Sequence, residues 1–159
     1  MTKRFSKAHY EEAFEVDGFL RDIYVLSTSL DDWDEFLKFV KSSSYPHSFR
    51  VNHTLAPMPQ DARIALSLRH DAAPLLQIAL RGATLNCHFF HDADIELDLD
   101  PREIVDDTRA DAVLAFMAEM SAALRKEVRL TEENSPERII FQYEPKTGSV
   151  RYVAPDYGR

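Results

Sequence analysis

One stretch of the chain, from Leu85 to Ile104, gathers side chains of the types that bind metals or transfer protons. It reads LNCHFFHDADIELDLDPREI and contains the only cysteine, two of the six histidines and six carboxylates. Three structures are compatible with these residue types: a calcium-binding loop, a transition-metal site, and a β-hairpin with one acidic face.

The carboxylates of this stretch follow part of the spacing of an EF-hand calcium loop. Counted from Asp92, they stand at positions one, three, five, seven, nine and twelve, and the last is Glu103. Such a loop needs glycine at position six because the chain turns sharply there, whereas this chain has Leu97. The strand-like LNCHFF also stands where an EF-hand has a helix. A calcium site is therefore the least favoured of the three.

A transition-metal site would use Cys87, His88, His91 and Asp92. Zinc takes three or four ligands of these types at about 2.0–2.3 Å. In an extended chain, however, His88 and His91 point to opposite faces, so only a bend at His91 could bring them together, and a distant residue such as His53 or His70 would have to complete the set. No CxxC or HExxH spacing supports the site.

A β-hairpin explains the stretch best, with one strand in ATLNCHFF and the other in IELDL. Alternation would turn the aliphatic side chains of the second strand to the core and its carboxylates to the other face. Neighbouring carboxylates would stand about 6.6–7 Å apart, and each pair would repel by about 0.6 kcal/mol in water and more where water is excluded. The row must therefore face solvent, a cation or a basic partner. We call these residues the acidic row: Asp94, Glu96, Asp98 and Asp100.

Two amphipathic helices are predicted elsewhere in the chain. The first follows Ser29, a potential N-cap, with apolar residues at helical spacing from Leu30 to Val40. The second occupies residues 108–128, with Thr108 as the expected cap and basic residues near its C-terminal end.

The remaining regular segments are typical of strands. They carry alternating or β-branched residues and are bounded by proline, glycine or turn residues. The predicted strands, besides the two of the hairpin, are 20–26, 48–55, 62–70, 74–82, 139–143 and 150–153, and residues 130–137 are predicted to form a loop. We therefore expect an α+β fold: an antiparallel meander sheet of about seven or eight strands with both helices packed on one face.

Length and composition predict one acidic domain. The chain has 159 residues and a formal net charge of −8, so we expect a single domain over 1–159, less ordered at 1–14 and 154–159. The charge argues against nucleic acid as a partner. No apolar run is long enough to span a membrane, and the single cysteine is typical of a cytoplasmic protein. No cofactor or catalytic motif is present.

Three hypotheses for function follow. The first is a non-catalytic protein-binding module, of the inhibitor, immunity or chaperone kind, whose acidic row binds a basic protein. Prevention of aggregation at strand edges would by itself be a sufficient reason for the row, and surface charges usually need no other. The second is a metal-binding domain or small metal-dependent enzyme centred on Cys87, His88 and His91. The third is a pocket for a small apolar ligand near Trp33, Phe36 and Phe116.

Overall fold

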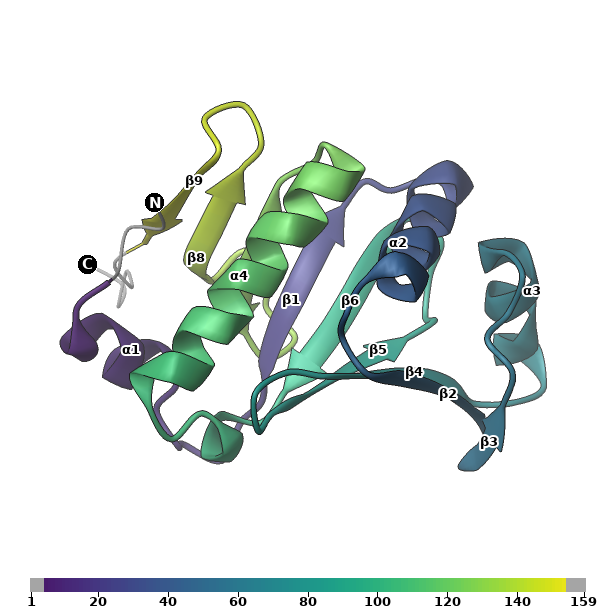
Figure 1. Cartoon of the computed structure of the whole chain (residues 1–159), viewed down its shortest axis with the longest axis horizontal. Helices are drawn as coiled ribbons and strands as arrows, with labels where there is room; N and C mark the ends of the chain where they lie inside the picture. The colour runs from purple at the N-terminus through teal and green to yellow at the C-terminus, as the bar shows by residue number, and fades with distance from the viewer. Residues whose placement is uncertain (1–4, 154–159) are drawn as a thin grey trace.

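The computed structural model describes residues 5–153 of the chain, and within that range it contains one antiparallel sheet of nine strands and four α-helices (Figure 1). The order of the strands in the sheet is β3-β2-β4-β5-β6-β1-β7-β8-β9. The predicted α+β class is confirmed, with slightly more strands than expected. The strands are β1 (Arg21–Leu26), β2 (His47–Val51), β3 (Thr54–Ala56), β4 (Pro74–Ala79), β5 (Thr84–His88), β6 (Asp94–Leu99), β7 (Val128–Glu132), β8 (Ile139–Glu144) and β9 (Ser149–Tyr152).

The helices are α1 (Lys7–Ala13), α2 (Leu30–Ser42), α3 (Ala62–Ser67) and α4 (Asp107–Leu124), and two 3-10 turns, η1 (Leu68–His70) and η2 (Pro101–Glu103), complete the regular structure of this range. Helices α2 and α4 lie side by side on one face of the sheet, as predicted, and α1 lies beside α4 near strands β8 and β9 (Figure 1). Helix α3 lies next to α2 at the other end of the sheet. We call the sheet face that is turned away from α2 and α4 the open face.

The hydrophobic core fills the space between the helices and the sheet. Trp33 and Phe36 of α2 and Phe116 of α4 are fully buried there, together with the aliphatic side chains of the central strands. This packing fixes the orientation of every central strand, because each must turn its apolar side to the helices and its other side to the open face.

Local sequence signals account for the first of the predicted helices. Ser29 caps α2 with a capping box, in which its side chain accepts a hydrogen bond from the backbone N–H of Asp32 and the Asp32 side chain accepts one from Ser29. Of the apolar residues predicted at helical spacing from Leu30 to Val40, the structure buries Trp33, Phe36, Leu37 and Val40, while Leu30 is half-buried at the start of the helix. Helix α4 begins slightly earlier than predicted, because Asp106 and not Thr108 provides the cap.

The predicted strand over residues 62–70 is wrong, since this segment forms α3 and η1. Its residues alternate in polarity, but Ala62, Ala65 and Leu66 also recur at helical spacing, and these are the side chains that become buried. Asp61 accepts a hydrogen bond from the backbone N–H of Ile64 and so caps the helix. Ile64, which the strand would have placed in the core, is 45% exposed.

Asp61→Ala is expected to lower the free energy of unfolding by about 1 kcal/mol, because the first turn of α3 loses its cap. Asp61→Asn keeps an acceptor at the same place and should cost much less. Chemical denaturation of the two variants measures the difference. Equal stability of Asp61→Ala and the unchanged protein would show that α3 does not depend on this cap.

Three further elements differ from the predictions. The single strand predicted over 48–55 is a hairpin, in which Asn52 and His53 form the turn with φ of 50° and 69°. Helix α4 ends at Leu124, where Arg125 adopts φ of 56°. The chain then forms strand β7, in a region predicted to be the end of a helix and a loop. A strand is favoured there because β7 completes the backbone hydrogen bonds of both β1 and β8.

The N-terminal region contains helix α1, which the sequence patterns do not predict. Buried Arg21 holds its C-terminal end: its Nε donates to the carbonyl of Ala13 at 2.8 Å, and Nη2 donates to the carbonyl of Glu15 at 2.9 Å. Residues 1–14 and 154–159 were expected to be less ordered than the rest of the chain. Residues 1–4 and 154–159 lie outside the described residues.

Candidate functional site on the open sheet face

The hairpin interpretation of the opening stretch is confirmed in its geometry. Strand β6 pairs with β5 on one side and with β1 on the other. Its aliphatic side chains Ile95, Leu97 and Leu99 are fully buried beneath the helices. Because side chains alternate along a strand, the acidic row therefore lies on the open face.

The pairing of β6 with β1 brings a further carboxylate to this row. Asp22 stands directly opposite Asp98, and Tyr24 stands opposite Glu96. The hydroxyl of Tyr24 lies between the acids: it is 3.1 Å from the Asp22 carboxylate and 3.3 Å from that of Glu96. Three carboxylates from two strands thus meet on the open face, and we call Asp22, Glu96 and Asp98 the acidic cluster.

The loop between β7 and β8 covers one end of this cluster. The backbone N–H of Asn134 donates to Asp22 at 2.7 Å, and Arg129 donates to the carbonyl of Pro136 at 2.9 Å. As a result Asp22 is only 2% exposed. Glu96 and Asp98 are half-buried and remain accessible from the open face.

The environment of the cluster disfavours ionised carboxylates. Burial raises the pKa of Asp22 above its usual range, and the charges of Asp98 and Glu133 raise it further, against the opposing hydrogen bonds from Asn134 and Tyr24. Burial and the charge of Asp22 also raise the pKa of Glu96. At neutral pH this part of the protein therefore carries electrostatic repulsion that a nearby cation would relieve.

His88 is the basic side chain that pairs with the cluster among residues 5–153. Its Nε2 lies 2.9 Å from a carboxylate oxygen of Asp98. The hydrogen bond with Asp98 raises the pKa of His88 above its ordinary 6.5, and the charges of Glu96 and Asp22 act in the same direction, although burial opposes them. The imidazole stacks on the ring of Phe90, with the two ring centres 4.9 Å apart, and Phe90 is 52% exposed.

A line of polar side chains continues from the cluster across three more strands. Asn86 donates to Asp98 at 3.1 Å, Gln77 donates to Asn86 at 3.1 Å, and Arg50 donates to Gln77 at 3.3 Å. Asn86 and His88, both on β5, thus contact the two carboxylate oxygens of Asp98, Asn86 at Oδ1 and His88 at Oδ2. The carboxylate is therefore held in one position before any ligand arrives, which reduces the entropy lost on binding.

The pKa shifts predict that the protein is more stable at mildly acidic than at mildly alkaline pH. The pKa of His88 is raised in the folded state, so its contribution to stability is complete below pH 6.5 and is lost as the pH rises through the folded-state pKa. The raised pKa of Glu96 acts in the same direction, because stability falls as the pH rises from its ordinary 4.5 through the folded-state pKa.

We therefore expect the melting temperature to rise as the pH is lowered from about 8 to about 6. Differential scanning calorimetry measures this directly. The double variant His88→Gln/Glu96→Gln should show a weaker rise, whereas His70→Gln, which changes an exposed histidine on η1, should not change the slope. A pH profile that is the same in all three proteins would contradict the proposed electrostatics.

The two ends of the acidic row are arranged differently from its centre. Asp94 lies at the first residue of β6, opposite Leu26. Asp100 lies beyond the strand, where it caps η2 and forms an ion pair with Arg102 at 2.7 Å. The hydrogen bonds from Arg102 lower the pKa of Asp100 below its usual range. Asp100 therefore has an intramolecular partner, while Glu96 and Asp98 form the centre of the site.

The structure does not assemble the residues of the metal-site hypothesis. Cys87 is fully buried on the helix side of β5, and burial raises the pKa of its thiol well above the ordinary value. His88 lies on the open face, and His91 and Asp92 are exposed in the turn between β5 and β6. Within residues 5–153 no group of three or more histidine, cysteine, aspartate or glutamate side chains is placed to hold a metal ion.

The residues of the apolar-ligand hypothesis pack against other core side chains. Trp33 and Phe36 meet edge to face, with ring centres 6.0 Å apart, and Trp33 also stacks on Phe89 at 5.3 Å. Phe116 contacts the rings of Phe39 and Tyr45. All three named residues are fully buried.

None of the helices described in residues 5–153 has the length and apolar character required to cross a membrane.

Sequence reasoning missed Asp22, Tyr24 and the role of His88 in this site. A signal for the first two was present, since Asp22 and Tyr24 alternate with Ile23 and Val25, but the position of their strand beside β6 is a property of the tertiary structure.

Searches of known protein families, of curated proteins and of solved structures find nothing that matches this chain.

Proposed function

We propose that the protein is a non-catalytic binding module that uses its open sheet face to bind a basic protein. The observation that carries this proposal is the acidic cluster, in which Asp22, Glu96 and Asp98 meet on a face that α2 and α4 do not cover. An inhibitor, an immunity-type protein or a chaperone would use such a surface.

The acidic cluster costs the isolated protein free energy. The pKa values of Asp22 and Glu96 are raised by burial and by neighbouring carboxylates, so their ionised forms are less stable here than in water. A lysine or arginine side chain placed against Glu96 and Asp98 would offset that cost and would form charge-assisted hydrogen bonds. Carboxylates needed only for solubility would cost the fold less free energy at positions fully exposed to water.

Phe90 adds an apolar contact beside the charges. Its ring is exposed and is stacked on His88, which in turn is bonded to Asp98. Protein interfaces commonly combine an aromatic side chain with hydrogen-bonded charges at their centre. The arrangement supports a protein partner more than a free small cation.

The proposal is tested by affinity capture from a lysate at low salt, followed by elution with a salt gradient and identification of the eluted proteins. We expect a basic protein that is released as the salt concentration rises, because electrostatic contacts weaken with ionic strength. Absence of any specifically captured protein, or release that does not depend on salt, would refute the proposal.

A matched control separates the open face from general acidity. Asp31→Asn/Glu35→Gln removes two exposed carboxylates from α2, which lies on the other face of the sheet. This variant should capture the same protein and release it at nearly the same salt concentration. If it loses the partner, net charge and not the open face is responsible for binding.

A further inference from the structure

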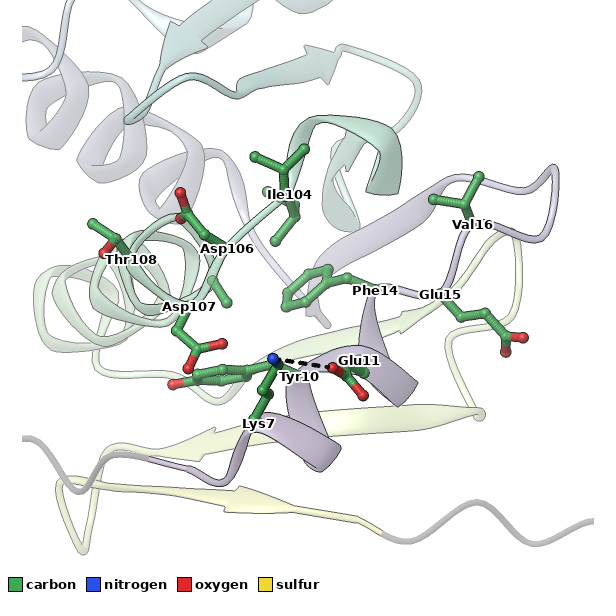
Figure 2. Close-up of a pocket in the computed structure, with 12 residues that line it drawn as sticks. Lys7, Tyr10, Glu11, Phe14, Glu15, Val16, Ile104, Asp106, Asp107 and Thr108 are labelled. Carbon is green, nitrogen blue, oxygen red and sulfur yellow. Dashed lines mark ion pairs between the residues drawn. The ribbon is translucent and has the colours of Figure 1, made fainter.

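Three hollows follow one another around one end of the sheet. The first, of about 610 Å³, lies between α1 and the start of α4 (Figure 2). The second, of about 350 Å³, shares Val16 with the first. The third, of about 510 Å³, shares Leu20, Asp100 and Arg102 with the second and includes Asp98 of the acidic cluster. Because neighbouring hollows share lining residues, the three lie next to one another between the open face and the helix side, and we call them together the groove.

Exposed apolar side chains gather along this groove. Val16, Phe19 and Val105 are 62%, 62% and 67% exposed, and each lines the first or second hollow. They make up half of the six large apolar side chains that are exposed among the described residues. We call these three residues the apolar patch. In the first hollow, the rings of Phe14 and Tyr10 and the side chain of Ile104 continue the apolar surface inward (Figure 2).

The rim of the groove is acidic. The first hollow is lined by four carboxylates and one lysine, and that lysine, Lys7, lies 3.9 Å from Glu11 (Figure 2). The second and third hollows are lined by Asp98, Asp100 and Glu103 and by one basic residue, Arg102. Arg102 already forms an ion pair with Asp100. The four carboxylates of the first hollow are Glu11, Glu15, Asp106 and Asp107.

We propose that the basic partner continues from the open face into this groove with a segment that carries an apolar side chain between basic ones. This inference rests on the proposed function, and it adds a second surface to it. The apolar patch would bury the apolar side chain, while the acidic rim would face its basic neighbours. Continuity with the acidic cluster and the charge of the rim both favour this occupant over an apolar or acidic segment.

The experiment uses two short lysine-rich peptides that differ only at one central position, which is leucine in one and serine in the other. Fluorescence anisotropy gives the Kd of each for the full chain. We expect the leucine peptide to bind about tenfold more tightly, as burial of one leucine side chain predicts. The double variant Phe19→Ser/Val105→Ser should lose this preference and keep both the affinity and the salt dependence of the serine peptide.

Ile64→Ser is the matched control, since it replaces an exposed apolar residue on α3, outside the groove. It should retain the preference for leucine. Equal affinity of the two peptides for the unchanged protein, or a preference that survives in Phe19→Ser/Val105→Ser, would overturn the inference. Light scattering that shows a dimer dissociated by the double variant would also overturn it, because a second copy would then occupy the patch.

These outcomes are distinct from failure of the proposed function. If neither peptide binds in a salt-dependent manner, the open face does not attract cations and the proposed function fails as well. If the serine peptide binds in a salt-dependent manner but the leucine peptide has no advantage, only the role of the apolar patch is rejected. The melting temperature of each variant confirms that the fold is retained.

Discussion

Asp94→Asn/Glu96→Gln is expected to weaken binding of the captured partner by about thirtyfold to a hundredfold, which corresponds to about 2–3 kcal/mol. The variant removes two accessible charges from the acidic row and leaves Asp98 with its partners His88 and Asn86. The dependence of affinity on salt should also become shallower. Calorimetric titration at several salt concentrations measures both effects.

The same variant should be at least as stable as the unchanged protein. The amide introduced by Glu96→Gln retains an oxygen that can accept the hydrogen bond from Tyr24, while the repulsion between residue 96 and Asp22 disappears. Relief of like-charge contacts across strands contributes roughly 0.2–1 kcal/mol. Weaker binding together with undiminished stability would indicate that the charges serve binding at a cost to the fold.

Two results would count against this account. One is an unchanged Kd in Asp94→Asn/Glu96→Gln, and the other is an equal loss of affinity in Asp31→Asn/Glu35→Gln, which has the same net charge. A marked loss of stability in the first variant would show that Glu96 has a structural role that the contacts with Tyr24 do not explain.

Trp33→Ala is expected to lower the free energy of unfolding by about 3–5 kcal/mol. Trp33 is fully buried, packs on Phe36 and Phe89, and donates from Nε1 to the carbonyl of Asp92 at 3.1 Å. It therefore joins α2 to the turn that precedes the acidic row. Truncation leaves a cavity in the core and releases that turn. Denaturation with urea measures the loss of stability.

Trp33→Phe separates the cavity from the hydrogen bond. Phenylalanine fills most of the volume, and the carbonyl of Asp92 still accepts a hydrogen bond from Thr28 at 2.7 Å. The loss should therefore be smaller, about 1–2 kcal/mol. Hydrogen exchange should show faster opening of residues 89–93 in Trp33→Ala than in Trp33→Phe. Equal stability of the two variants would mean that packing of the indole contributes little.

Local patterns were sufficient to predict some parts of the fold. The strict alternation from Asp94 to Leu99 predicts an extended strand with its acids on one face, and the structure confirms it. The capping box at Ser29 predicts the start of α2 in the same way. In both cases the information lies within a few neighbouring residues, so no knowledge of the rest of the chain is required.

Patterns that fit two structures led to wrong predictions. Residues 62–70 satisfy the spacing of a strand and of a helix, and the choice depends on the cap at Asp61 and on the contact with α2. Asp34 of α2 accepts a hydrogen bond from the backbone N–H of Ala62 at 2.8 Å. Strand β7 was missed because its stability comes from backbone hydrogen bonds to β1 and β8, which are distant in sequence.

The sequence by itself determined the α+β class and the outward orientation of Glu96 and Asp98, because alternation of side chains along a strand is a local property. Only the tertiary structure decided that β1 lies beside β6, which places Asp22 opposite Asp98 and converts a row of acids into a cluster. The physical reason is that strand order follows from burial of the whole apolar surface beneath the helices. The free energy of that burial depends on every element of the chain and not on a few neighbouring residues.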